Sequence, residues 1–290
     1  MALKEKNVHY FPGHMQKAIR TIGNYVKIVD LIIEIVDARA PYSSRNPILD
    51  GLCGDKPRLI LLSKEDLADE AITKRWVDYF SASGIKAVSS DLRKGKLVKV
   101  LSSSCATLLT GKREKEARLG MKKQPIRAMV IGIPNVGKST LINNISGRRA
   151  ANVGNKAGVT RAEQWLKLND DFTLLDTPGV LPMNYPDGAM AVRLAILGSM
   201  REDVLPTRDL AYALLGYLRE NYPTILSSRF LIDDLTSVSS DDALLRIANR
   251  RGLLEGPSPS LEKAAYLLIK EFKDGLLGRA SLEAPEHRDA

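Results

Sequence analysis

Short apolar runs alternate with amphipathic stretches over the first two thirds of the chain. Runs at 31–36, 58–62 and 128–131 each end at a polar residue or a glycine, which is typical of buried parallel strands. Further strands are predicted at 85–88, 163–168 and 172–175, and helices at 14–27, after SKEDL (63–67) to about 81, at 96–109 and at 138–145. Strands that alternate with helices predict an α/β fold with a mostly parallel sheet covered on both faces.

The last third of the chain has a different pattern. Apolar residues at helical spacing predict helices at 188–200, 209–220, 241–250 and 260–272, without the alternation that strands would give. We therefore expect two domains, an α/β domain at 1–182 and a small all-helical domain at 183–290. Residues 281–290 are expected to form a loose tail.

Residues 126–142 read IRAMVIGIPNVGKSTLI, the strand, glycine loop and helix order of a P-loop. Lys138 is predicted to reach the β- and γ-phosphates, and Ser139 to bind Mg²⁺, at the positive end of the following helix. A glycine turn that merely precedes a lysine is the alternative, which the flanking strand and helix disfavour. The residues predicted to surround the phosphates are Asn135, Val136, Gly137, Lys138, Ser139 and Thr140.

DTPG at 176–179 has the DxxG spacing of a nucleotide switch. Asp176 is predicted to hold a Mg²⁺-bound water. The N–H of Gly179 is predicted to meet the γ-phosphate, because glycine has no side chain in the way. Thr160, in the preceding AGVT, is the hydroxyl expected to close over Mg²⁺ when a γ-phosphate is present.

No NKxD motif follows the switch, so the base-reading residues are expected before the P-loop. SKED at 63–66 follows a predicted strand, with Asp66 in the carboxylate position and Ser63 where Asn is usual. A carboxylate that accepts two donors favours guanine over adenine. A helix N-cap is the alternative interpretation of SKED. The residues predicted to bind the base are Ser63, Lys64, Glu65, Asp66, Asp91 and Leu92.

The charge of this 290-residue chain is uneven. Residues 1–182 contain 30 Lys and Arg against 18 Asp and Glu, whereas residues 183–290 contain 13 against 16, for a net charge of +9. Residues 93–127 alone hold eleven basic residues. This block favours a polyanion such as RNA as partner, with a merely solvated surface as the alternative. Neither a membrane span nor a secretion signal is indicated, so we expect a cytoplasmic protein.

DARAPYSSRNP, SKED, GIPNVGKST, AGVT and DTPGV, in this order, resemble the circularly permuted GTPases of the YlqF type, as do FPGHM, RRGLL and GRASLEAP. The resemblance covers nearly the whole chain. It implies a P-loop GTPase fold in permuted order, G4-G5-G1-G2-G3, followed by a helical C-terminal domain. It also implies a bacterial GTPase that uses GTP, GDP and Mg²⁺. Such a protein acts in late assembly of the large (50S) ribosomal subunit, and its C-terminal domain contacts ribosomal RNA.

The residue after DTPG is Val180, where many GTPases have the Gln that orients the attacking water. His14 in FPGHM and a K⁺ ion held by Asn135 are the two candidate replacements. The predicted catalytic residues are His14, Lys138, Thr160 and Gly179. Hydrolysis by the isolated chain, which we expect to be a monomer, should be slow and stimulated by the pre-ribosomal particle.

Two other functions stay open on the sequence alone. One is a nucleotide-gated RNA-binding module whose hydrolysis is incidental. The other is an ATP-using P-loop enzyme, if Asp66 only caps a helix. Ser63 in place of Asn puts the affinity for the base in doubt more than the choice of base.

Overall fold

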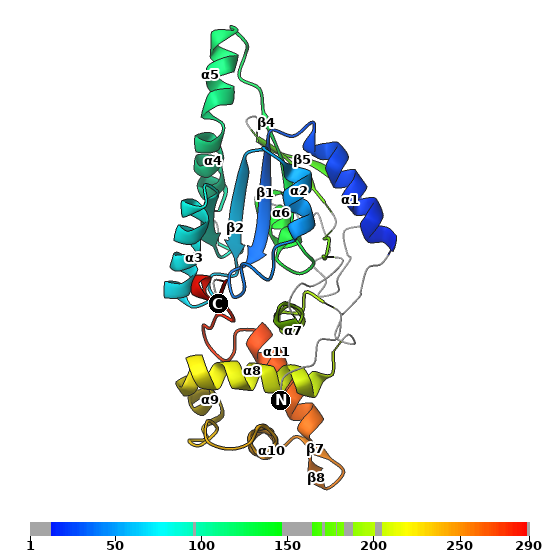
Figure 1. Cartoon of the computed structure of the whole chain (residues 1–290), viewed down its shortest axis with the longest axis vertical. Helices are drawn as coiled ribbons and strands as arrows, with labels where there is room; N and C mark the ends of the chain where they lie inside the picture. The colour runs from blue at the N-terminus through cyan, green and yellow to red at the C-terminus, as the bar shows by residue number, and fades with distance from the viewer. Residues whose placement is uncertain are drawn as a thin grey trace. The chain divides into compact units, whose positions relative to one another are not determined.

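The structure is a computed structural model that describes residues 13–94, 97–146, 164–169, 172–177, 179–182, 188–200 and 205–288. These residues form two compact units. The α/β unit comprises residues up to 182 together with 283–288, and the helical unit comprises 188–282. Figure 1 shows the strands of the first unit and the helices of the second.

A six-stranded sheet with the strand order β3-β2-β1-β4-β6-β5 forms the centre of the α/β unit. The strands are β1 (Leu31–Asp37), β2 (Arg58–Ser63), β3 (Lys86–Ser90), β4 (Ile126–Ile131), β5 (Gln164–Asn169) and β6 (Phe172–Asp176). All neighbouring pairs are parallel except β5 and β6, which are antiparallel. The prediction of a mostly parallel sheet is confirmed, with the strands close to their expected bounds.

The parallel register decides where the motifs lie. Asp37 at the end of β1 pairs with Ser63 at the end of β2, and Val130 in β4 pairs with Asp176 at the end of β6. All seven residues of β1 are buried, as expected of a central strand with helices over both faces. The ends of β1, β2, β3, β4 and β6 therefore share one border of the sheet, called the carboxyl edge below, where ligands bind in such folds.

Six helices of the α/β unit are described: α1 (Gly13–Val26), α2 (Pro47–Cys53), α3 (Glu70–Ala82), α4 (Leu97–Leu108), α5 (Thr110–Arg118) and α6 (Lys138–Ser146). In Figure 1, α3 and α4 lie on one side of the sheet, α1 and α2 lie on the other, and α5 continues beyond the sheet. The sequence pattern predicts neither α2 nor α5. An apolar periodicity is missing from α5 because most of its residues are exposed to solvent and its one buried residue is Glu116.

The helical unit contains α7 (Gly188–Ile196), α8 (Thr207–Asn221), α9 (Pro223–Phe230), α10 (Ser240–Arg251) and α11 (Leu261–Lys273), with a small ribbon of β7 (Leu254–Glu255) and β8 (Ser258–Pro259). The α11 helix packs against α8 and α10. A helical C-terminal part is confirmed, with α9 and the ribbon as elements that the pattern does not predict. None of the helices in the described ranges is long and apolar enough to cross a membrane.

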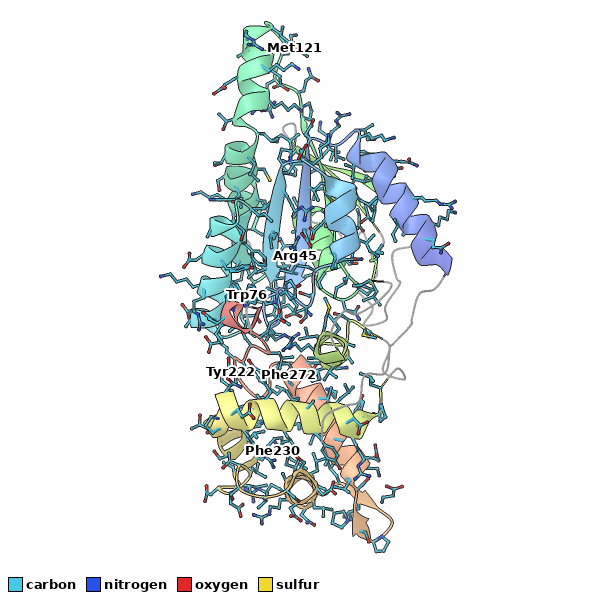
Figure 2. The ribbon with its side chains drawn as sticks, in the orientation of Figure 1. Arg45, Trp76, Met121, Tyr222, Phe230 and Phe272 are labelled. Atoms are coloured by element: carbon cyan, nitrogen blue, oxygen red, sulfur yellow. The ribbon has the colours of Figure 1, made fainter. Side chains whose placement is uncertain are left out.

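The expectation of a loose tail at 281–290 is wrong for its described part. Residues 281–285 are buried, and a short 3-10 helix follows at Pro285–Arg288. The indole N–H of Trp76 in α3, labelled in Figure 2, donates a hydrogen bond to the carbonyl of Glu283 at 3.2 Å. The tail is ordered by partners far away in the sequence, which a local pattern does not reveal.

Candidate functional site

The P-loop begins directly after β4 and has the backbone that a phosphate cradle needs. Gly132 and Gly137 have φ angles of +154° and +104°. A Cβ atom at Gly132 would lie 2.6 Å from the carbonyl oxygen of Ile35, so only glycine fits there. Lys138 opens α6, and its Nζ atom donates to the carbonyls of Gly132 at 3.1 Å and Ile133 at 2.8 Å. The ammonium group therefore lies inside the loop, where its N–H groups could donate hydrogen bonds to a phosphate.

Lys138 and Asp176 share this buried region. Burial lowers the pKa of Lys138 to about 8, against the attraction of Asp176. Burial likewise raises the pKa of Asp176, against the opposing effect of Lys138. Within the described residues the Oδ1 atom of Asp176 is buried without a hydrogen-bond partner. An unpaired buried carboxylate oxygen is costly, so it fits a water on a Mg²⁺ ion that Ser139, half-buried in the first turn of α6, would bind.

The end of the DTPG stretch lies against the P-loop. A Cβ atom at Gly179 would lie 2.8 Å from the backbone nitrogen of Pro134 and 2.9 Å from Nζ of Lys138. The N–H of Val180 donates to the carbonyl of Gly132 at 3.3 Å. Val180 is completely buried, and an apolar buried side chain has no group to orient an attacking water. The structure thus places Gly179 beside Lys138, and both residues are predicted to contact the γ-phosphate.

Ser63 connects the end of β2 to the P-loop. Its Oγ atom lies 2.6 Å from the carbonyl oxygen of Val136 in the loop and 2.9 Å from that of Val36 in β1. Leu92, after β3, also lies close to the loop: a Cβ atom at Gly137 would be 2.8 Å from its Cδ1 atom. Two predicted base-binding residues therefore contact the phosphate loop directly.

A buried ion network follows β1 and β2. Lys64 has a left-handed backbone with φ of +57°, and its Nζ atom lies 2.8 Å from Oδ2 of Asp37. The guanidinium of Arg39 binds the same carboxylate at 3.0 Å and 2.9 Å. Burial alone would raise the pKa of Asp37, but Arg39 and Lys64 hold it well below its usual range. Burial lowers the pKa of Lys64, although Asp37 opposes this.

The sequence reasoning did not select Asp37 and Arg39 as site residues. A signal was available, because the DAR of DARAP follows a predicted strand just as SKED and DTPG do. All three stretches lie at the carboxyl edge. Arg39 is only 1% exposed, which is unusual for an arginine, and its charge is compensated by Asp37.

Asp66, the predicted guanine-binding carboxylate, lies at the same edge. It pairs with the guanidinium of Arg93, whose Nε atom lies 3.0 Å from Oδ1 of Asp91. Glu65 accepts a hydrogen bond from the N–H of Asp91 at 3.0 Å, which ties the ends of β2 and β3 together. The side chain of Arg93 is 67% exposed. Because exposed ion pairs contribute little, a guanine can compete for the Asp66 carboxylate.

Two predicted catalytic residues are not placed. Thr160 lies outside the described residues. His14 belongs to α1, but its side chain is outside the described part of the chain. Asn135 lies in the P-loop with φ of +61° and is half-buried. The roles of His14, Thr160 and Asn135 therefore stay predictions.

Known proteins resemble this chain in sequence and in structure. The family model described as 50S ribosome-binding GTPase matches residues 127–211. Ribosome biogenesis GTPase A of Bacillus cereus is 38% identical over 96% of this chain and 94% of its own length. The protein of that name from Priestia megaterium is 38% identical over 97% and 98%. The solved structure of GNP-bound YlqF from T. maritima has a TM-score of 0.65 and 29% identity, covering 93% of this chain and 99% of that one.

The match to full-length relatives includes the segments before the P-loop as well as the helical unit. The structural match to YlqF likewise spans nearly the whole of both chains, so it includes the strands that come before the P-loop. The chain therefore belongs to the ribosome biogenesis GTPase A family and is a GTPase of ribosome biogenesis with a circularly permuted fold.

Proposed function

We propose that this chain is a cytoplasmic, monomeric assembly factor that binds the maturing large ribosomal subunit and hydrolyses GTP when the particle completes its active site. The observation that carries this proposal is the carboxyl edge. There a carboxylate follows β2, the P-loop lysine follows β4, and an aspartate oxygen that has no hydrogen-bond partner among the described residues ends β6. The family model and the relatives' names supply the ribosomal context.

In the proposed complex, Asp66 accepts the ring N–H and the amino group of guanine, and the aliphatic stem of Lys64 covers the ring. The backbone N–H of Leu92, after β3, donates to the guanine oxygen, whereas the N–H of Asp91 already donates to Glu65. Its support is that Glu65 and Ser63 already hold these chain segments beside the P-loop. Adenine would leave the Asp66 charge without its pair of donors, so it is rejected.

The phosphates are bound by the P-loop amides from Asn135 to Thr140 and by the ammonium group of Lys138. Mg²⁺, when bound, neutralises charge between the β- and γ-phosphates. Ser139 and Thr160 would ligate it, and the Oδ1 atom of Asp176, which has no hydrogen-bond partner within the described ranges, would hold one of its waters. The N–H of Gly179 binds the γ-phosphate, which its closeness to Lys138 supports.

Hydrolysis needs a group that Val180 does not supply. We assign the positioning of the attacking water to His14 and the neutralisation of charge between the phosphates to a K⁺ ion at Asn135. Both groups reach their active positions when the particle is bound. The test is GTP turnover with and without large-subunit precursor particles, in K⁺ and in Na⁺, with ATP as competitor. Strong stimulation by the particle, lost in His14→Ala and weaker in Na⁺, is the expected result.

Three outcomes would overturn parts of this assignment. Equal use of ATP would remove the guanine role of Asp66. If the particle does not change the turnover, the chain is better explained as an RNA-binding module. Its binding would be controlled by nucleotide, and its hydrolysis would be incidental. Full stimulation of His14→Ala would remove the histidine from the reaction.

The RNA contact is proposed on two surfaces, the helical unit and a basic arm made of α5 and residues 119–125. Figure 1 shows α5 beyond the sheet, and Figure 2 shows Met121 at the far end of the arm. Lys115, Arg118 and Lys122 are exposed, and none of them pairs with a carboxylate in the described residues. Neighbouring basic side chains of the arm pair with Asp30 or Glu116. The three unpaired cations support phosphate binding by the arm.

A charge-matched pair of variants tests the arm. The arm variant combines Lys115→Gln, Arg118→Gln and Lys122→Gln, and the control combines Lys27→Gln, Lys74→Gln and Lys86→Gln at other exposed sites. Loss of three phosphate contacts should lower the slope of log affinity against log salt for RNA or particles by about two to three. An equal loss in the control would mean that only the net charge matters. Binding of the unmodified chain to anionic vesicles, lost in the arm variant, would assign the arm to a membrane instead.

A further inference from the structure

Glu283 lies outside every nucleotide motif, yet its carboxylate is buried in the α/β unit. It is only 3% exposed. Oε1 accepts the backbone N–H groups of Tyr42 at 2.5 Å and Ser43 at 2.9 Å, and Oε2 accepts the hydroxyl of Ser43 at 2.5 Å. Hydrogen bonds to a charged acceptor are stronger than neutral ones. Three of them converge on one short loop, so this carboxylate fixes the position of the loop.

That loop, residues 38–46, joins β1 to α2 and is held by hydrogen bonds of its own. The hydroxyl of Ser44 accepts from the N–H of Asp37 at 2.9 Å and donates to the carbonyl of Ala40 at 2.7 Å. The N–H of Arg45 donates to the carbonyl of Tyr42 at 3.1 Å. A displacement at the residues that Glu283 holds is therefore passed along the loop to its end.

The loop ends at Asn46, which contacts the nucleotide switch. Its side-chain Oδ1 atom caps α2, and its Nδ2 atom donates to the carbonyl of Val180 at 2.8 Å. Val180 also donates its N–H to Gly132 of the P-loop. The peptide groups on both sides of Val180 are thus held, one by the P-loop and the other by Asn46. Gly179, directly before it, lies against Lys138 as a result.

We propose that Glu283 is a positioning residue for the γ-phosphate switch, acting through the 38–46 loop and Asn46. The carboxylate near the chain end keeps Asn46 on Val180, and Asn46 keeps the N–H of Gly179 at the P-loop. GDP has no γ-phosphate and makes no use of that N–H. The contribution of Glu283 is therefore confined to the GTP-bound state and to hydrolysis.

The experiment compares Glu283→Ala and Glu283→Gln with Glu286→Gln, in the same tail. Glu286 is 60% exposed and pairs at the surface with Arg75, so it is a matched control. The measurements are the affinities for GDP and for a non-hydrolysable GTP analogue, single-turnover GTP hydrolysis, and the melting temperature. Glu283→Ala should lower the ratio of analogue to GDP affinity about tenfold and slow hydrolysis, with GDP affinity unchanged. Glu283→Gln, which keeps one acceptor, should lie between, and Glu286→Gln should match the unmodified chain.

A double-mutant cycle with Asn46→Ala separates positioning from general stability. Because Glu283 acts through Asn46, Glu283→Ala should add little to the effect of Asn46→Ala on the affinity ratio. Additive effects would overturn the proposal, and so would an equal loss of GDP and analogue affinity. A rise in analogue affinity or in turnover would also overturn it, because the contact would then be inhibitory. Should Glu283→Ala fail to fold, Ser43→Ala removes one of the three hydrogen bonds and takes its place in the same cycle.

Discussion

The Nζ atom of Lys64 lies 2.8 Å from the Oδ2 atom of Asp37, at the ends of the neighbouring strands β2 and β1. Arg39 binds the same carboxylate, so one buried anion compensates two cations. Lys64 is the lysine of SKED, which is expected to cover the guanine ring. The stretch DAR thus holds a residue of the proposed base site in place.

Asp37→Asn should destabilise the fold and weaken GDP binding together. Arg39 would stay buried, and Lys64 half-buried, without their anion, which costs about 3–5 kcal/mol in comparable cases. Denaturant unfolding and GDP titration measure the two effects. Asp50→Asn is the control, because that carboxylate is 46% exposed in its pairs with Arg45 and Arg58; its loss should cost at most about 1 kcal/mol. Equal effects of the two substitutions would contradict the buried role of Asp37.

Ser63→Ala should lower the affinity for GDP and leave the preference for GTP over ATP intact. The variant removes the hydroxyl between the Val36 and Val136 carbonyls, at a cost of about 1–3 kcal/mol. The P-loop loses its tie to β2, whereas the Asp66 carboxylate is unchanged. Fluorescent GDP titration with ATP competition provides the readout. Ser103→Ala, at an exposed hydroxyl in α4, should change neither quantity, and a change in base preference in Ser63→Ala would show that Ser63 contacts the base.

Gly179→Ala should abolish GTP hydrolysis and preserve GDP binding. The added Cβ would lie 2.8 Å from the Pro134 backbone nitrogen and 2.9 Å from Nζ of Lys138, so the switch must move away from the P-loop. Single-turnover hydrolysis and GDP affinity are measured side by side. Gly111→Ala in α5 is the control, since nothing lies within 4 Å of its added Cβ. Retained hydrolysis in Gly179→Ala would mean that its N–H is not needed at the γ-phosphate.

GDP affinity should fall as the pH rises above the pKa of Lys138, which burial lowers to about 8. Below that pH the ammonium is charged before and after binding. Above it, the free protein must take up a proton to meet the phosphates, so affinity falls by up to about tenfold per pH unit. Titration calorimetry at about pH 8.5 in buffers of different ionisation heat measures the proton uptake. Lys138→Arg keeps its charge and should show neither the slope nor the uptake.

The same lysine has the opposite effect on folding. Between pH about 8 and the unperturbed pKa of 10.5, the unfolded chain holds a proton on Lys138 that the folded, nucleotide-free chain has lost. Stability from this group therefore rises with pH over that window. Urea unfolding of the nucleotide-free protein should show this gain, and Lys138→Met, which has no charge in either state, should lack it. A gain of the same size in Lys138→Met would assign it to other groups.

The strands, and the border of the sheet at which the motifs meet, can be predicted from the amino-acid pattern. Buried parallel strands read as apolar runs, and parallel pairing puts their ends together, so SKED, GIPNVGKST and DTPG could be brought to one edge without coordinates. The helical C-terminal part follows from its apolar periodicity in the same way. These are local properties, carried by neighbouring residues.

Tertiary structure alone decided which side chains hold that edge in place. The α5 helix has no apolar stripe because most of its residues are exposed and its one buried residue is Glu116, so no apolar pattern marks it. In the sequence, Ser63 is only a substitute for the usual Asn of the base motif. The structure shows its hydroxyl between the carbonyls of Val36 and Val136. Glu283 reads as part of a charged tail, yet it is buried against Ser43. Such partners are distant in sequence. The sequence does not reveal whether an isolated polar side chain forms its hydrogen bonds with water or with a buried donor.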